Sequence, residues 1–372
     1  MGQIIFGFAV LCLMALLLVI CISGWSWSLR QLLRGEPILR QETGEPISWG
    51  LIDIVATIVI ALMLMAGFQG IAMAVTGAKL PIKEDSLDAV QQAAMILAFS
   101  GAELLSLLAV SGLIVVRGYG LQLFGHRGEK FFADLLLGIA AFGMLVVPTL
   151  ILQAILAYLK PYEHPLIDML IKDKSVPMAV ASVAAAVVAA PLFEEFFFRG
   201  LFQGWLQDTV DGRLKISNVL LGRVRWLSQE DASPPELVTA EVDSAAEQEP
   251  KEEIITAVSA SGGRENPFDS PTTAPVVPTT EYESLAASRQ RSLLQICGPI
   301  LLSASFFALM HLGQGLAPIP LFFLALGLGY LYQRTRRLTP CVVVHFLLNG
   351  QSMALLLIQV FVLGEDAALI AN

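Results

Sequence analysis

The fold class follows from one apolar stretch, PMAVASVAAAVVAAPLFEEFFFRGLFQGWL at residues 177–206, in which only Glu194, Glu195 and Arg199 are charged. A helix of about 20 predominantly apolar residues is long enough to cross the hydrocarbon core of a bilayer. Because lipid cannot satisfy free backbone polar groups, a spanning segment is a helix or a strand of a closed barrel, and this stretch lacks the alternation of a barrel strand. The stretch therefore predicts a transmembrane helix that carries ionisable side chains.

Seven further apolar stretches of similar length bring the number of expected spans to eight. The composition agrees, because 55% of the residues are hydrophobic, 15% are charged and the mean hydropathy is +0.69, whereas soluble domains are about 45–50% apolar and about 25% charged. We expect an all-α integral membrane protein, a bundle of about eight transmembrane helices, and not a cytosolic enzyme, a disulfide-stapled secreted module or a nucleic-acid binder. The other expected spans are 4–28, 50–76, 90–116, 131–158, 294–314, 317–333 and 340–363.

Basic residues are concentrated in alternate loops, and this pattern predicts the orientation of the spans. The loops after the first, third and seventh spans and the segment after the fifth span hold most of the Lys and Arg, and neither terminus holds any. We therefore expect both termini on the outside and residues 207–291 in the cytoplasm. For a bacterial chain this means a multi-pass protein of the cell membrane.

The long segment after the fifth span changes character along its length. Residues 212–228 mix aliphatic and basic side chains, as in an amphipathic helix on anionic headgroups. From about 229 to 289, Pro, Glu, Ser and Thr dominate, and such a composition cannot bury enough apolar surface to offset the entropy of ordering. We expect a short amphipathic helix followed by a disordered cytoplasmic insert.

The expected spans retain several ionisable side chains, which are costly in a membrane and are therefore functional candidates. Arg199 follows Glu195 by one helical turn and can pair with it, which leaves Glu194 without a local partner. His311 lies in the sixth span, and His345 and Asn349 lie one turn apart in the eighth. A further intramembrane acid, Glu103 in SGAELLSLL, is interpreted as a structural hydrogen-bonding residue.

Three short motifs in these spans resemble the CPBP family of intramembrane proteases, whose eukaryotic members are the type II CAAX prenyl endopeptidases and whose bacterial members include bacteriocin-processing and self-immunity proteins. The motifs are EEFFFR at 194–199, FALMH at 307–311 and HFLLN at 345–349. In this sequence residues 200–310 separate the first motif from His311, whereas the family usually has a short connection there.

The resemblance implies a role for each motif residue and a division of the chain. Glu194 would be the general base that activates a water with the help of His311, while His345 and Asn349 would stabilise the oxyanion and Glu195 with Arg199 would support the site. A desolvated carboxylate suits such a base, and donors aimed at an oxyanion stabilise it. The expected organisation is an N-terminal four-span region at 1–174, a CPBP-like catalytic membrane core at 175–206 and 292–372, and a cytoplasmic insert at 207–291.

The sequence leaves the use of a metal and the class of function open. Glu194, His311 and His345 could instead hold Zn²⁺ with a water in the fourth position. We expect an intramembrane endopeptidase whose partners are the lipid bilayer and a membrane-bound or lipidated peptide or protein. A transporter would also place acids, His and Asn in its spans, although no inverted repeat typical of transporters is visible. A non-catalytic scaffold or immunity protein is the third possibility.

Overall fold

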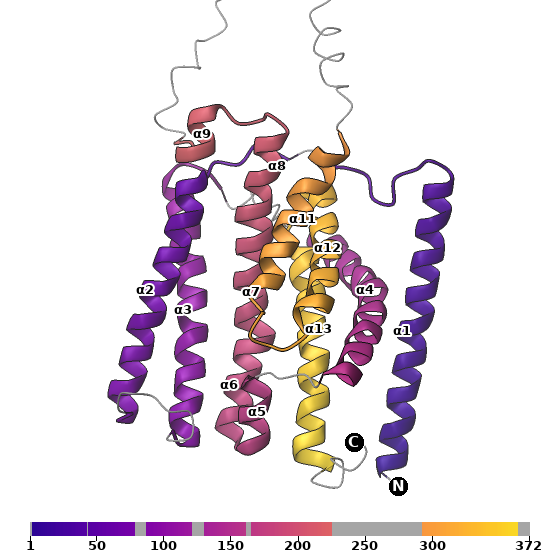
Figure 1. Cartoon of the computed structure of the whole chain (residues 1–372), viewed down its shortest axis with the longest axis vertical. Helices are drawn as coiled ribbons and strands as arrows, with labels where there is room; N and C mark the ends of the chain where they lie inside the picture. Colours follow the sequence, from indigo (N-terminus) through magenta and orange to yellow (C-terminus); the bar gives the residue numbers. More distant parts are fainter. Residues whose placement is uncertain are drawn as a thin grey trace, which may run out of the picture. The chain divides into compact units, whose positions relative to one another are not determined.

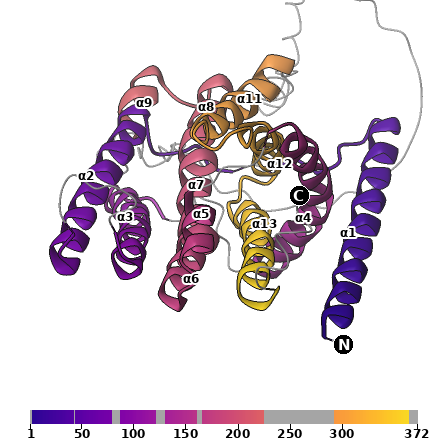
Figure 2. The same cartoon turned by 60° about the horizontal axis from the view of Figure 1, so that its bottom comes forward.

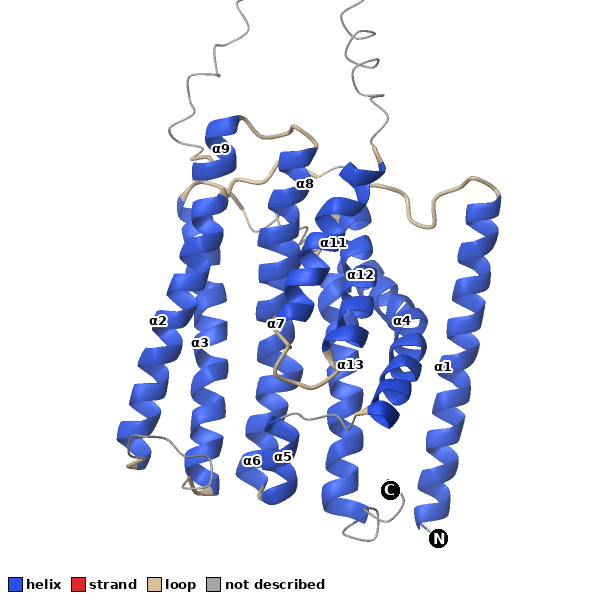
Figure 3. Cartoon of the chain, in the orientation of Figure 1, coloured by secondary structure: helices blue, strands red, loops and turns tan. Residues whose placement is uncertain are grey.

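The apolar stretches of the sequence form helices throughout the part of the chain that a computed structural model describes, residues 2–42, 44–78, 87–120, 130–160, 165–224 and 292–363. No strand occurs in these ranges (Figure 3). The α-helices are α1 (Gly2–Leu33), α2 (Leu51–Thr76), α3 (Ala89–Val116), α4 (Phe131–Leu159), α5 (Pro165–Lys172), α6 (Val176–Val183), α7 (Ala190–Glu195), α8 (Gly204–Val210), α9 (Ile216–Leu221), α11 (Leu293–Leu309), α12 (Pro318–Thr335) and α13 (Thr339–Ile358). Three π-helical segments are η4 (Ala184–Ala189), η5 (Phe196–Gln203) and η7 (Gln359–Leu363).

Six of these helical stretches are long and apolar enough to cross a membrane, which agrees with an all-helical, multi-pass membrane protein. Large apolar side chains such as Val75, Leu62 and Phe132 are exposed along them, as expected for surfaces that face lipid. The start of α1 and the end of α13 lie at one end of the helices, and α8, α9 and the start of α11 lie at the other (Figure 1). The six stretches are Leu11–Leu33, Leu51–Thr76, Ala89–Val116, Phe131–Leu159, Val176–Val210 and Thr339–Phe361.

The prediction of about eight spans is not confirmed, because the expected spans 294–314 and 317–333 form a helical hairpin. α11 has 17 residues, fewer than the about 20 that a bilayer needs. α12 packs against α11 and runs in the opposite direction (Figure 1). The turn between them, residues 310–317, lies beside the middle of the long central helix and not at its far end (Figure 1). The hairpin therefore enters the helix bundle only part of the way.

The long central helix, which we call the rod, runs from α6 through η4, α7 and η5 to α8 (Figures 1 and 2). A π-helix uses i→i+5 hydrogen bonds and is commonly found at functional sites. Backbone carbonyls of the two π-helical segments accept hydrogen bonds from other helices or from the loop before α2: Ala186 from Asn349 Nδ2 at 2.8 Å, Phe198 from the Ser303 hydroxyl at 3.0 Å, and Leu201 from Trp49 Nε1 at 3.0 Å. Tertiary contacts thus fix both wide turns that flank Glu194 and Glu195.

The amphipathic helix predicted over 212–228 is much shorter within the described residues. α9 covers only Ile216–Leu221 and ends at Gly222, whose φ of 74° belongs to the left-handed region that glycine adopts readily. Arg213 and Arg223, expected to face lipid headgroups, instead bind the protein: Arg213 pairs with Asp208, and Arg223 donates to the carbonyls of Pro46 and Ile47. The remainder of that stretch and the insert predicted at 229–289 lie outside the described residues.

Candidate active site

The candidate site centres on a fully buried ion pair at the junction of α7 and η5. Glu195 and Arg199 are both 0% exposed, and Arg199 Nε lies 3.2 Å from Glu195 Oε2. The guanidinium carbon of Arg199 lies over the Phe307 ring, 4.8 Å from its centroid. The pairing predicted from the four-residue spacing is therefore present, and α11 covers it through an aromatic face.

His345 of α13 joins this pair and connects it to Glu194. His345 Nδ1 lies 2.9 Å from Glu195 Oε1, and its Nε2 lies 3.7 Å from Glu194 Oε2. Since the Glu195 carboxylate can only accept, His345 donates its Nδ1 proton, which leaves Nε2 directed toward Glu194. The side chain of Glu194 is 21% exposed, whereas that of Glu195 is 0% exposed. Of the two adjacent acids, Glu194 is thus the one that a substrate or a water can reach.

His311 lies in the turn that follows α11, two residues past the helix end at Leu309, and not inside a span as predicted. Its Nδ1 lies 2.9 Å from the Phe307 carbonyl oxygen. A carbonyl can only accept a hydrogen bond, so Nδ1 carries the proton and Nε2 of the neutral ring is free to accept one. His311 also interacts electrostatically with Glu194, as do His345, Glu195 and Arg199. The turn of the hairpin thus brings His311 to the same group of charges.

Asn349 lies one turn after His345 on α13 but has a different partner. Its Nδ2 donates to the Ala186 carbonyl of η4 at 2.8 Å. No hydrogen bond joins Asn349 to Glu194, Glu195 or His345 in the described part of the chain. One of the two amide N–H groups of Asn349 is therefore hydrogen-bonded to the rod, and only the other remains available to a ligand.

Close contact with α4 fixes the position of α13. A Cβ atom added at Gly138 would lie 2.6 Å from Val343 Cβ and 3.0 Å from the Pro340 carbonyl oxygen, so glycine allows the two helices to approach. Near the start of α13, Arg337 Nε pairs with the buried Asp134 at 2.8 Å. These contacts fix the first half of α13, which carries His345.

Two residues near the site were not identified correctly from the sequence. Phe307 entered only as a motif position, yet it is 0% exposed and its ring contacts those of Phe198, His311 and His345 at centroid distances of 5.1, 4.9 and 6.0 Å. The interpretation of Glu103 as a structural hydrogen-bonding residue is wrong for the described structure. It is 5% exposed, and no described residue forms a hydrogen bond or ion pair with it.

The arrangement does not fit the zinc site considered from the sequence. Among the residues that the structure describes, no group of three or more His, Cys, Asp or Glu side chains is placed to hold a metal ion. The candidate ligand set Glu194, His311 and His345 is not among such groups.

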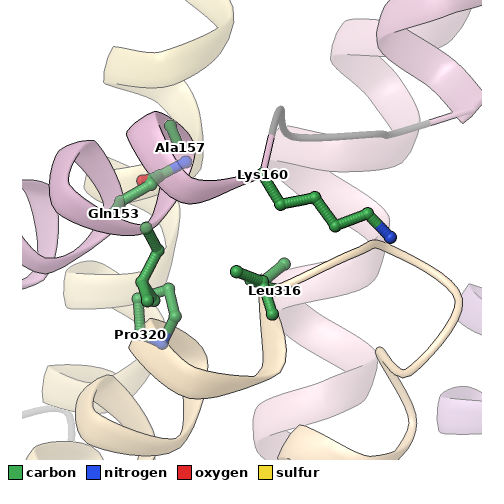
Figure 4. A pocket seen from close by; sticks show the side chains of 7 residues that line it. Gln153, Ala157, Lys160, Leu316 and Pro320 are labelled. Atoms are coloured by element: carbon green, nitrogen blue, oxygen red, sulfur yellow. The ribbon is translucent and has the colours of Figure 1, made fainter.

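A shallow pocket lies away from this cluster, between the end of α4 and the start of α12 (Figure 4). It contains none of the candidate residues, and most of its lining is apolar. The lining residues are Gln153, Leu156, Ala157, Lys160, Leu316, Ala317 and Pro320.

The fold and the site together define a helical, multi-pass membrane protein in which acids and histidines from separate helices meet in a buried cluster. Residues 283–351 match the family model described as Type II CAAX prenyl endopeptidase Rce1-like. This match agrees with the family resemblance of the motifs, and the matched family is a protease family. It covers FALMH and HFLLN but not EEFFFR at 194–199. Searches of curated proteins and of solved structures find no match to the chain.

Proposed function

We propose that the protein is an intramembrane endopeptidase that hydrolyses a peptide bond of a membrane-associated or lipidated peptide or protein. The meeting of Glu194, Glu195 and His345 beside the His311 turn carries this proposal, because it brings two acids and two histidines together from the rod, α13 and the hairpin. The family match supports hydrolysis as the reaction. For a bacterial chain we propose the cell membrane as its location, with the 207–291 segment in the cytoplasm.

Glu194 is suited to be the general base. Its carboxylate is the accessible one of the adjacent pair, while Glu195 is already engaged by Arg199 and His345. A water beside Glu194 would lose a proton to the carboxylate as its oxygen attacks the substrate carbonyl carbon. The free Nε2 of His311 would accept a hydrogen bond from the same water and orient it.

The oxyanion formed by this attack needs hydrogen-bond donors nearby. His345 Nε2 faces Glu194 at 3.7 Å, and as an imidazolium His345 would donate from Nε2 while Nδ1 stays on Glu195. The second N–H of Asn349 would add another donor. Glu195 and Arg199 would act indirectly, by fixing the orientation of His345.

The experiment that tests this function is a peptidase assay of the purified protein in detergent on a peptide library, with the wild type beside Glu194→Ala. Cleavage by the wild type and its absence in the variant would support the proposal. A wild type that cleaves no peptide, lipidated or free, in detergent or in lipid vesicles would contradict it.

Cleavage is expected to survive removal of metal ions. The described residues offer no preassembled three-ligand site, and a carboxylate can activate water without a metal. The measurement is the cleavage rate before and after extensive dialysis against a strong chelator, with a known zinc protease treated in parallel as control. A loss of cleavage that returns on addition of Zn²⁺ would contradict this prediction.

Deletion of residues 229–289 is expected to leave cleavage within about twofold of the wild type, because the loop-closure entropy of the fold varies only logarithmically with loop length. Both flanks of the segment are held by the membrane part: Arg223 donates to Pro46 and Ile47, and Gln295 Nε2 lies 3.4 Å from the Val210 carbonyl oxygen. A short Gly/Ser linker replaces the segment, and the assay above provides the rate. A deletion variant that folds but no longer cleaves would show that the insert takes part in the reaction.

A further inference from the structure

Glu103 on α3 is a buried acid that the site described above does not use. It is 5% exposed, and no described residue is hydrogen-bonded to it or paired with it. The nearest polar side chains of its own helix are also engaged elsewhere, since the Ser100 and Ser106 hydroxyls donate to the carbonyls of Ile96 and Ala102. An unpaired carboxyl group inside a membrane helix is costly and calls for a functional reason.

The packing of α3 indicates which segment of the rod lies beside Glu103. Ile96 and Val110 lie two turns before and after Glu103, on the same face of the helix. Ile96 packs against the cluster that contains Met178 and Val187, which precede α7 in the rod. Val110 packs in the cluster that contains Phe196–Phe198, which follow α7. Glu103 therefore faces α7 itself, the segment that carries Glu194, and α3 runs beside the rod in both views (Figures 1 and 2).

The acids near Glu194 differ in whether a cation is paired with them. Glu195 is paired with Arg199, whereas among the described residues neither Glu194 nor Glu103 is paired with a Lys or Arg side chain, and these two acids interact electrostatically. Where two carboxyl groups lie close together in a site of low dielectric, their like charges repel, and such pairs can divide the roles of base and acid. No hydrogen bond joins these two carboxyl groups in the described part of the chain.

Building on the proposed endopeptidase function, we propose that Glu103 is the catalytic acid that protonates the leaving nitrogen, with Glu194 as the base. Glu194 takes a proton from water as the water oxygen bonds to the carbonyl carbon and the π-electron pair moves to the carbonyl oxygen. An electron pair of the oxyanion then re-forms the C=O bond as the C–N bond breaks. The electron pair of the C–N bond stays on nitrogen, which takes the proton of the Glu103 carboxyl group. The proton on Glu194 then returns to Glu103 through a water, and the products are a carboxylic acid and an amine.

The test compares two substrates of one sequence, a peptide and its analogue with a thioester at the scissile bond. A thiolate leaves without being protonated, whereas an amine does not. Glu103→Gln is expected to lower the kcat for the peptide by about 100-fold or more, the usual scale for loss of a general acid, and to leave the thioester rate unchanged. Ser106→Ala, a change three residues away on the same helix, is the matched control and should alter neither rate.

Thermal unfolding in detergent separates this role from a structural one. Since the Glu103 carboxyl has no partner to lose, Glu103→Gln and Glu103→Leu are expected to unfold at or above the wild-type Tm, with the leucine variant the higher. The proposal is overturned if Glu103→Gln cleaves the peptide normally, if it slows both substrates equally, or if either variant melts below the wild type. Glu194→Gln should lose both substrates, and a wild type that cleaves neither would contradict the proposed function itself.

Discussion

Glu194→Gln is expected to lower the rate of peptide cleavage by about 1,000-fold or more, within the range that loss of a general base produces. The amide keeps the volume and the hydrogen-bonding capacity of the side chain, but it cannot take a proton from water. Glu194 is the reachable acid of the pair, 21% exposed and 3.7 Å from His345 Nε2. The measurement is kcat on the best peptide of the library, together with a thermal unfolding curve to establish that the variant is folded.

The adjacent acid provides the matched comparison. Glu195→Gln is expected to reduce cleavage less than Glu194→Gln, because Glu195 acts through His345 and the amide oxygen of the glutamine can still accept a hydrogen bond from His345 Nδ1–H. His311→Ala and His345→Ala should reduce cleavage strongly. If Glu194→Gln retains wild-type cleavage, or if Glu195→Gln is the more damaging change, Glu194 is not the base.

Arg199→Met is expected to destabilise the folded protein by about 3–5 kcal/mol, the cost of removing one partner from a buried ion pair. Arg199 and Glu195 are both 0% exposed, so the remaining carboxylate cannot be rehydrated. Met fills part of the space over the Phe307 ring, which limits the loss to the charge itself. The measurement is the free energy of unfolding in detergent, or the corresponding fall in Tm.

Arg213→Met is the control for this change. Arg213 also pairs with a buried acid, Asp208, but its side chain is 28% exposed and Arg336 pairs with the same carboxylate, so we expect a loss of only about 0–1 kcal/mol. The double variant with Leu at 195 and 199 should recover most of the stability and none of the cleavage. A fully stable Arg199→Met protein would mean that the pair contributes nothing to folding.

The long helices could be predicted because a helix that crosses a membrane is apolar along most of its length, so its hydropathy identifies it. The expected spans 50–76, 90–116 and 131–158 differ by one residue or less at each end from α2, α3 and α4. The hairpin was not predictable in the same way. α11 is apolar but has only 17 residues, and α12, although it has 18 residues, is not among the helices long and apolar enough to cross a membrane. α11 packs against the rod through Ser303 and Phe307 before the chain turns at Met310.

The contacts within one helix of the candidate site could be predicted from the sequence, but the contacts between helices could not. The spacing of Glu195 and Arg199 predicts their pairing, since both lie on one helix. The bond from Asn349 to Ala186 joins helices that are far apart in the chain, and nothing in the alanine-rich run of η4 indicates a wide turn there. The position of Glu103 level with α7 likewise depends on which face of α3 meets the rod, and hydropathy carries no information on that choice.

The π-helical segments η4 and η5 of the rod affect the direction in which Glu194 and Glu195 point around the helix axis. Each residue added to or removed from a helix rotates everything beyond it by about 100°. The bond from Asn349 fixes the rod at Ala186, and those from Ser303 and Trp49 fix it at Phe198 and Leu201. The number of residues between these fixed points therefore determines which way the two carboxylates point. Many apolar side chains would suit residues 187–193, but only one chain length does.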